Sequence, residues 1–210
     1  ISSAHAANLP QSVSLQYAGH YNGLTLPATM TFTRNGKGYK VVSTIKVPLY
    51  HIRFESGGSI SGNTIRPSYY KDVRGGKTYA EAKFRGNQVT YGKTGELQTE
   101  TVGGNISDLF TLAWQLAAND AKLPARLSIT NGKKIYPVSG MSKIGSGSYT
   151  LNGKAIPVEK YRVQRGDDTV TYSFATSLGN IPAQISYTDD GKTYDLKLTS
   201  VSINGKPVKP

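Results

Sequence analysis

The chain contains no cysteine among its 210 residues. This absence excludes disulfide bonds, thiolate metal sites and cysteine nucleophiles, and it also excludes lipid attachment at an N-terminal cysteine. Histidine is scarce, with three residues in the sequence. Because no His-x-x-x-His or comparable ligand spacing occurs, we expect no metal site and no cofactor.

Acidic residues are few, with 13 Asp and Glu against 25 Lys and Arg, so the net charge is +12. Such an excess gives a general affinity for anions. Two interpretations stay open: solubility alone, or an anionic partner such as a lipid, lipopolysaccharide or another envelope anion. Long apolar runs are also missing, and a membrane-spanning helix needs roughly 18 such residues in succession. We therefore expect a chain that does not span a membrane.

Residues 1–6 have the pattern of the end of a secretory signal. Ala4-His5-Ala6 is the small-x-small sequence that a signal peptidase reads, with cleavage before Ala7. A flexible N-terminal segment without this role is the alternative. The signal interpretation predicts a periplasmic, unlipidated protein of a Gram-negative bacterium, and export argues against nucleic acid as a partner. Residues 7–210 are then one domain.

The rest of the chain alternates apolar and polar residues in short segments that are separated by tight turns. Asn-Gly pairs, which favour two-residue hairpins, recur along it. About a dozen strands in this arrangement predict a single antiparallel β-barrel or a strongly curved half-barrel, because a flat sheet of this width would expose its edges. In the strand near 154–165 the apolar residues change from even positions (Ile156, Val158) to odd positions (Tyr161, Val163). This change indicates a β-bulge.

One stretch, residues 107–120, is predicted to be a helix that covers the sheet. Ser107 is a suitable N-cap, and Asp108 adds negative charge where the helix dipole favours it. We expect the helix to be a plug or lid of the barrel, with Trp114 at one rim. The residues that would face a ligand cavity are Leu109, Leu112, Ala113, Trp114 and Leu116.

Residues 64–88 form a more basic region that includes tyrosines, and they are the best candidate for contact with an anion. A solvated face of hairpins is the plainer interpretation. The candidate contact residues are Arg66, Tyr69, Lys71, Arg74 and Lys77.

No constellation of catalytic residues stands out. A serine nucleophile needs a histidine base held by a carboxylate, and no Gly-x-Ser-x-Gly elbow occurs between a strand and a helix. His20, His51 and Asp108 are the residues that a hydrolase would have to use. Asp167-Asp168 and Asp189-Asp190 are interpreted as turns. We therefore expect no enzymatic activity.

Several stretches in order carry a resemblance to a known family. They are Tyr21–Leu24 with Tyr39–Val41, Ser56-Gly57 with Arg66–Tyr69, the helix from Ser107 with Asp108 and Thr111, and Ile181–Ile185 with Asp190-Gly191. Together they resemble the periplasmic domain-of-unknown-function 3108 family. The resemblance implies a mainly antiparallel β-barrel or half-barrel and brings no activity with it.

Three functions remain open. The first is a non-enzymatic periplasmic protein of the cell envelope that binds an apolar or lipid-like anionic ligand in a β-cavity. The second is a protein–protein interaction or adaptor module of the envelope. The third, with the least support, is a hydrolase that acts on envelope polymers. A filled barrel and a hollow one share the same alternation of residues, so the sequence leaves the interior open.

Overall fold

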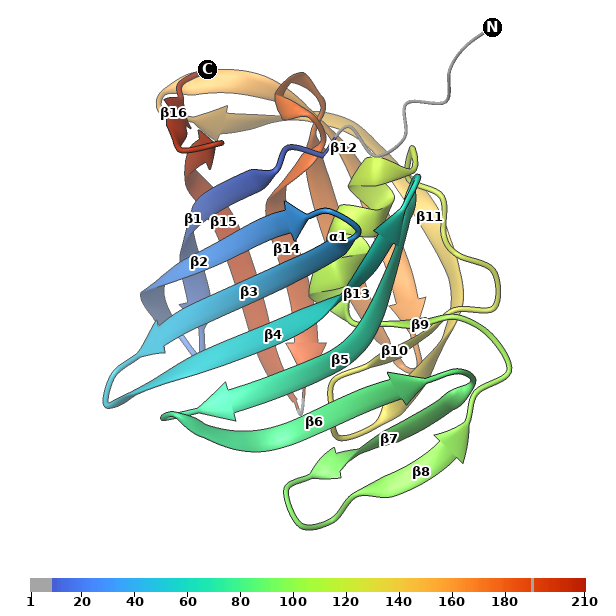
Figure 1. Ribbon diagram of the computed structural model, residues 1–210. Coiled ribbons are helices and arrows are strands. Elements are labelled where there is room, and N and C mark those ends of the chain that lie inside the picture. The colour runs from blue at the N-terminus through green and yellow to red at the C-terminus, as the bar shows by residue number, and fades with distance from the viewer. Residues whose placement is uncertain (1–8, 190) are drawn as a thin grey trace, which may run out of the picture.

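The computed structural model describes residues 9–189 and 191–210, which form one strongly curved sheet around a helix (Figure 1). Helix α1 spans Leu109–Ala118, and a 3₁₀ helix, η1, spans Thr176–Leu178. The strands are β1 (Ser12–Tyr21), β2 (Leu24–Asn35), β3 (Gly38–Val47), β4 (Tyr50–Ser61), β5 (Thr64–Arg74), β6 (Lys77–Arg85), β7 (Gln88–Lys93), β8 (Gln98–Thr101), β9 (Ile106–Ser107), β10 (Ser128–Thr130), β11 (Ile135–Leu151), β12 (Lys154–Arg165), β13 (Asp168–Ala175), β14 (Ile181–Asp189), β15 (Lys192–Ile203) and β16 (Lys206–Val208).

The sheet consists of two arms that meet at the ends of the chain. Strands β1 to β8 follow one another in the N-terminal arm, and β15 back to β9 follow one another in the C-terminal arm. β1 pairs with both β2 and β15, so the first strand closes the sheet against the last long one. Every neighbouring pair is antiparallel except β9 with β10. The prediction of a curved, mainly antiparallel β-fold with one helix is confirmed.

Asn-Gly turns set the register of several hairpins. At Asn22-Gly23, Asn152-Gly153 and Asn204-Gly205 both residues have positive φ. This is the geometry that two-residue hairpins with right-handed strand twist require, and asparagine and glycine tolerate it best. Local turn chemistry therefore fixes which strand residues lie opposite one another.

Helix α1 lies inside the curve of the sheet and contacts both arms (Figure 1). The Trp114 ring stacks on Phe32 of β2, with 4.8 Å between centroids, and Phe110 stacks on Phe54 of β4 at 5.1 Å. From the other arm, the Tyr172 hydroxyl donates to the Leu109 carbonyl at 2.5 Å. All residues from 109 to 116 are buried. A helix that is apolar all round belongs in a core, and this one fills the barrel.

Two expectations about the helix are wrong. Its N-cap is Asp108, because Ser107 still belongs to β9 and pairs with β10. Trp114 is fully buried instead of lying at a rim, because Phe32 and the rest of the core enclose it. A lid would expose its outer face, so the helix is a core element and not a lid.

The bulge expected near 154–165 lies on the neighbouring strand. β12 pairs with β13 without a shift from Val158 to Arg165, whereas β11 has register shifts between Val138 and Gly140 and between Lys143 and Gly145. Gly145 has a φ of 151°, which other residues rarely adopt, so β11 accommodates the extra residue more easily.

Across the described ranges, no helix is long and apolar enough to cross a membrane. The signal-like residues 1–6 lie outside the described ranges, so the export prediction stays a prediction.

Candidate functional site

The curved sheet has a seam where its two arms approach without pairing. β5 pairs with β6 from Tyr69 onward. In the described pairings, residues 64–68 are therefore hydrogen-bonded to β4 on one side and to no strand on the other. β9 contacts β5, and residues 64–67 of β5 and both residues of β9 line one cavity. We call this gap between β5 and β9 the seam.

A side chain of the helix closes part of the seam. The Ile65 backbone N–H donates to Gln115 Oε1 at 2.6 Å, and Gln115 Nε2 donates to the Asn63 carbonyl at 2.6 Å. The primary amide thus supplies one acceptor and one donor, as the backbone of a neighbouring strand would. Two residues further along, Pro67 has no N–H to offer. These two features block the addition of another strand at this edge.

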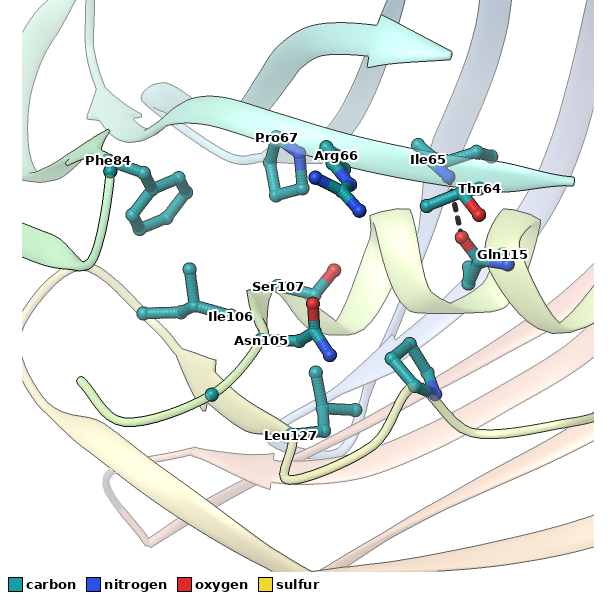
Figure 2. Close-up of a pocket in the computed structure, with 13 residues that line it drawn as sticks. Thr64, Ile65, Arg66, Pro67, Phe84, Asn105, Ile106, Ser107, Gln115 and Leu127 are labelled. Atoms are coloured by element: carbon teal, nitrogen blue, oxygen red, sulfur yellow. Dashed lines mark hydrogen bonds between the residues drawn. The ribbon is translucent and has the colours of Figure 1, made fainter. Parts of the chain in front are cut away.

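A cavity of about 300 Å³ remains open in the seam beside Gln115 (Figure 2). Its walls combine apolar and polar residues and come from β5, the end of β6, β9, the helix and the loop before β10. Arg66 is the charged residue in the lining, and Asn105, which also lines the cavity, is committed to the Ala125 carbonyl at 2.7 Å. The apolar lining consists of Ile65, Pro67, Phe84, Ile106, Pro124 and Leu127.

A second, shallower hollow adjoins this cavity. Both are lined by Gly86, Gly104 and Asn105, and the second adds Arg126. The seam cavity therefore has Arg66 in a lining with six apolar residues, and Arg126 lines the hollow beside it. An apolar site with a few placed polar groups is the usual form of a small-molecule site.

The five residues predicted to contact an anion do not form one patch. Arg66 lies at the seam cavity, whereas Tyr69 and Lys71 face outward and Lys77 is exposed at the start of β6. Arg74 points the other way and holds buried Asp72 through Nε and Nη2 at 3.2 and 3.1 Å. Lys71 Nζ lies 5.8 Å from the centre of the Tyr69 ring, so these two residues stay together, whereas Arg74 is set apart because successive residues of a strand face opposite sides.

The family-like Ser-Gly and Pro-Ser-Tyr stretches meet as a structural unit across β4 and β5. The Tyr69 ring lies over Gly57, where a Cβ would come within 2.8 Å of it. The Tyr69 hydroxyl donates to Glu55 at 2.5 Å, and the Ser68 hydroxyl donates to the Gly57 carbonyl at 3.1 Å. These contacts hold the β-bulge that brings Arg66 and Pro67 to the seam.

Asp108 anchors the start of the helix. Its Oδ1 accepts from the backbone N–H groups of Phe110 and Thr111 at 3.0 and 2.9 Å, and its Oδ2 accepts from the Thr111 hydroxyl at 2.7 Å. Burial raises the pKa of Asp108, and hydrogen bonds from Thr111, Ser56 and Phe110 offset this in part. The Asp-x-x-Thr pattern is therefore a helix cap.

The raised pKa of Asp108 predicts a pH-dependent stability. Between the ordinary carboxyl pKa and the raised one, the folded state binds more protons than the unfolded state, so this group's contribution is lost as pH rises. Asp108→Asn keeps a side-chain oxygen for the cap but does not titrate. Urea unfolding between pH 4 and 7 should show a smaller loss of stability in the variant. An equal loss in both proteins would contradict the assignment.

The hydrolase residues are not brought together. His20 and His51 are exposed on the outer face of β1 and β4, whereas Asp108 is buried at the helix start. His20 Nδ1 instead lies 3.1 Å from the Thr25 hydroxyl. Within the described ranges, no group of three or more His, Asp or Glu side chains is placed to hold a metal ion.

The residues that build the seam cavity were missed from the sequence, with the exception of Arg66. Phe84, Ile106 and Leu127 belong to distant segments, and their apolar character alone does not separate them from core residues. Gln115 was the available signal, because it is a polar residue in an otherwise apolar helix. Its partners, Asn63 and Ile65, lie about 50 residues earlier in the chain.

The fold and the seam define a class of protein: a β-barrel-like domain filled by its own helix, with a cavity where the barrel stays open. The chain belongs to the family described as "Protein of unknown function (DUF3108)", which matches residues 16–199. This confirms the family resemblance found in the sequence.

A solved structure supports the fold. The chain is similar to a beta-barrel-like protein of the domain of unknown function DUF1849 from Brucella abortus, with a TM-score of 0.58 and 11% identity. The similarity covers 91% of this chain and 97% of that one. Curated proteins gave no match. At this identity the similarity establishes the fold alone.

Proposed function

We propose that the protein is a non-enzymatic, periplasmic binding protein of the cell envelope that holds an anionic amphiphile in the seam. The observation that carries this proposal is the seam cavity, which combines an apolar lining with Arg66 at its border. The apolar part of the ligand would lie against Phe84, Ile106 and Leu127. Its carboxylate or phosphate would accept hydrogen bonds from Arg66, whose planar fork suits such groups.

The filled interior supports placing the ligand at the seam. Helix α1 occupies the centre of the barrel, where the sequence-based hypothesis put the ligand. The blocked strand edge at Gln115 and Pro67 supports recognition by side chains over recognition of a peptide backbone. The net charge of +12 favours an anion at the protein surface.

Calorimetric titration with dodecanoate below its critical micelle concentration tests the proposal. Arg66→Gln should weaken binding about tenfold or more, because a hydrogen bond to a charged group contributes about 1.5–3 kcal/mol. Lys77→Gln is the matched control, since it removes one positive charge from the same basic region away from the cavity. It should leave the affinity unchanged.

Two outcomes of this titration would contradict the proposal. The first is no saturable binding to the unmodified protein. The second is an equal loss of affinity in Arg66→Gln and Lys77→Gln, which would show that net charge alone attracts the ligand.

A second candidate function is an interaction module of the envelope. The observation in its favour is β8, which pairs with β7 and has all four residues exposed. Its sequence, Gln-Thr-Glu-Thr, contains neither proline nor lysine, the residues that commonly protect such edges. A partner strand could therefore add to this edge, unlike the blocked edge of β5.

A further inference from the structure

A cavity of about 240 Å³, separate from the seam and its adjoining hollow, lies at the C-terminal end of helix α1. The helix ends at Ala118, and the Ala121 backbone N–H donates a hydrogen bond to the Leu116 carbonyl at 2.9 Å. Asp120 and Ala121 have φ values of 49° and 56°, so the chain leaves the helix sharply there. Residues that line the cavity include Leu116, Asp120, Glu159, Tyr161, Phe174 and Asn180.

Two aromatic rings form a corner of this cavity. Tyr161 of β12 and Phe174 of β13 have ring centroids 6.0 Å apart and planes inclined at 56°. Phe174 is buried and Tyr161 is half-buried. Ring faces carry partial negative charge, and inclined rings can contact one cation from two sides.

The electrostatic character of the cavity is negative, in contrast to the protein as a whole. The C-terminal end of a helix carries a partial negative charge, and no basic residue lies in the last turn of α1 to offset it. Asp120 adds a carboxylate with no ion pair or hydrogen bond to another described side chain. Glu159 is already engaged, since Lys143 Nζ lies 3.0 Å away and the Ser146 hydroxyl donates to it.

We infer that this cavity binds a small alkylammonium ion. The rings of Tyr161 and Phe174 would contact its alkyl groups, and Asp120 would offset its charge. An organic cation fits better than a metal ion, because the lining offers aromatic carbon and not a set of three or more ligand side chains. Such a group occurs both in free solutes and in choline headgroups of lipids. This inference does not depend on the seam.

Titration with tetramethylammonium chloride at constant ionic strength, followed by the amide NMR signals of Ala121 and Asn180, tests the inference. Saturable binding is expected, and ammonium chloride should bind more weakly because it lacks the methyl groups that contact the rings. Tyr161→Leu and Asp120→Asn should each weaken binding about fivefold, whereas Tyr161→Phe keeps the ring and should bind like the unmodified protein.

Asp120→Asn changes an exposed residue, so it keeps the test valid even if Tyr161→Leu disturbs folding. The absence of saturable binding would overturn the inference, and so would equal affinity for ammonium. Unchanged affinity in Asp120→Asn would also overturn it. Comparing choline with dodecylphosphocholine, both followed by the signals of Ala121 and Asn180, then separates a free solute from a lipid headgroup. Arg66→Gln should leave the affinity for choline unchanged.

Discussion

Replacing Trp114 with alanine should lower the free energy of unfolding by about 3–5 kcal/mol, the usual cost of removing a large buried aromatic side chain. The Trp114 ring is fully enclosed and stacks on Phe32, so its loss leaves a cavity between the helix and the N-terminal arm. Urea unfolding followed by circular dichroism measures the change.

Two further variants test whether the loss of stability is specific to the buried ring at position 114. Trp114→Phe should cost less, because it keeps an aromatic ring and removes an indole N–H that has no hydrogen-bond partner. Leu49→Ala removes a fully exposed leucine and should change stability by less than about 0.5 kcal/mol. If Trp114→Ala cost no more than Leu49→Ala, the helix would not be seated inside the barrel.

Gly58→Ala should lower the free energy of unfolding by about 3 kcal/mol, the upper part of the usual range for overpacking. A Cβ at Gly58 would lie 2.1 Å from the Arg66 carbonyl oxygen and 2.8 Å from Pro67 Cα. Both are backbone atoms of the bulge in β5, so no side-chain rotation can relieve the clash. Thermal and urea unfolding would measure the loss.

Gly140→Ala is the matched control for this clash. Gly140 also lies in a strand, but a Cβ there would meet no atom within 4 Å. We expect it to be close to neutral. Because Arg66 and Pro67 line the seam cavity, Gly58→Ala should also weaken dodecanoate binding. Equal stability of the two glycine variants would contradict the tight packing of the bulge.

The sequence predicted the features that depend on local patterns. The apolar spacing of Leu109, Leu112 and Leu116 located the helix, and the Asn-Gly pairs located hairpins whose geometry the structure confirms. The family resemblance was also correct. Patterns of this kind involve residues that are close in sequence, so they can be recognised without knowledge of the fold.

The features that depend on distant contacts were not predicted. Ser107 and Asp108 are both good N-cap residues, and pairing of Ser107 with β10 decides between them. The parity change in β12 was visible, but the extra residues lie on β11, which the alternation within β12 does not show. The position of Trp114 depended on whether the barrel was filled, which alternation along the strands does not encode.

The candidate site shows the same limit. Arg66 was singled out for its charge, but its four companions were chosen by proximity in sequence, and none of them lines the seam cavity. The seam itself exists because β5 loses its pairing before Tyr69 and Gln115 reaches across to Ile65. Neither event leaves a local signature.

The central claim is that the ligand lies in the seam and not inside the barrel, and mapping of amide NMR shifts during titration with dodecanoate tests it most directly. We expect the largest shifts on Ile65, Phe84, Ile106 and Leu127, and in Arg66→Gln the same shifts should need about tenfold more dodecanoate. Shifts centred on Trp114 and Phe32, with the seam residues unchanged, would contradict it.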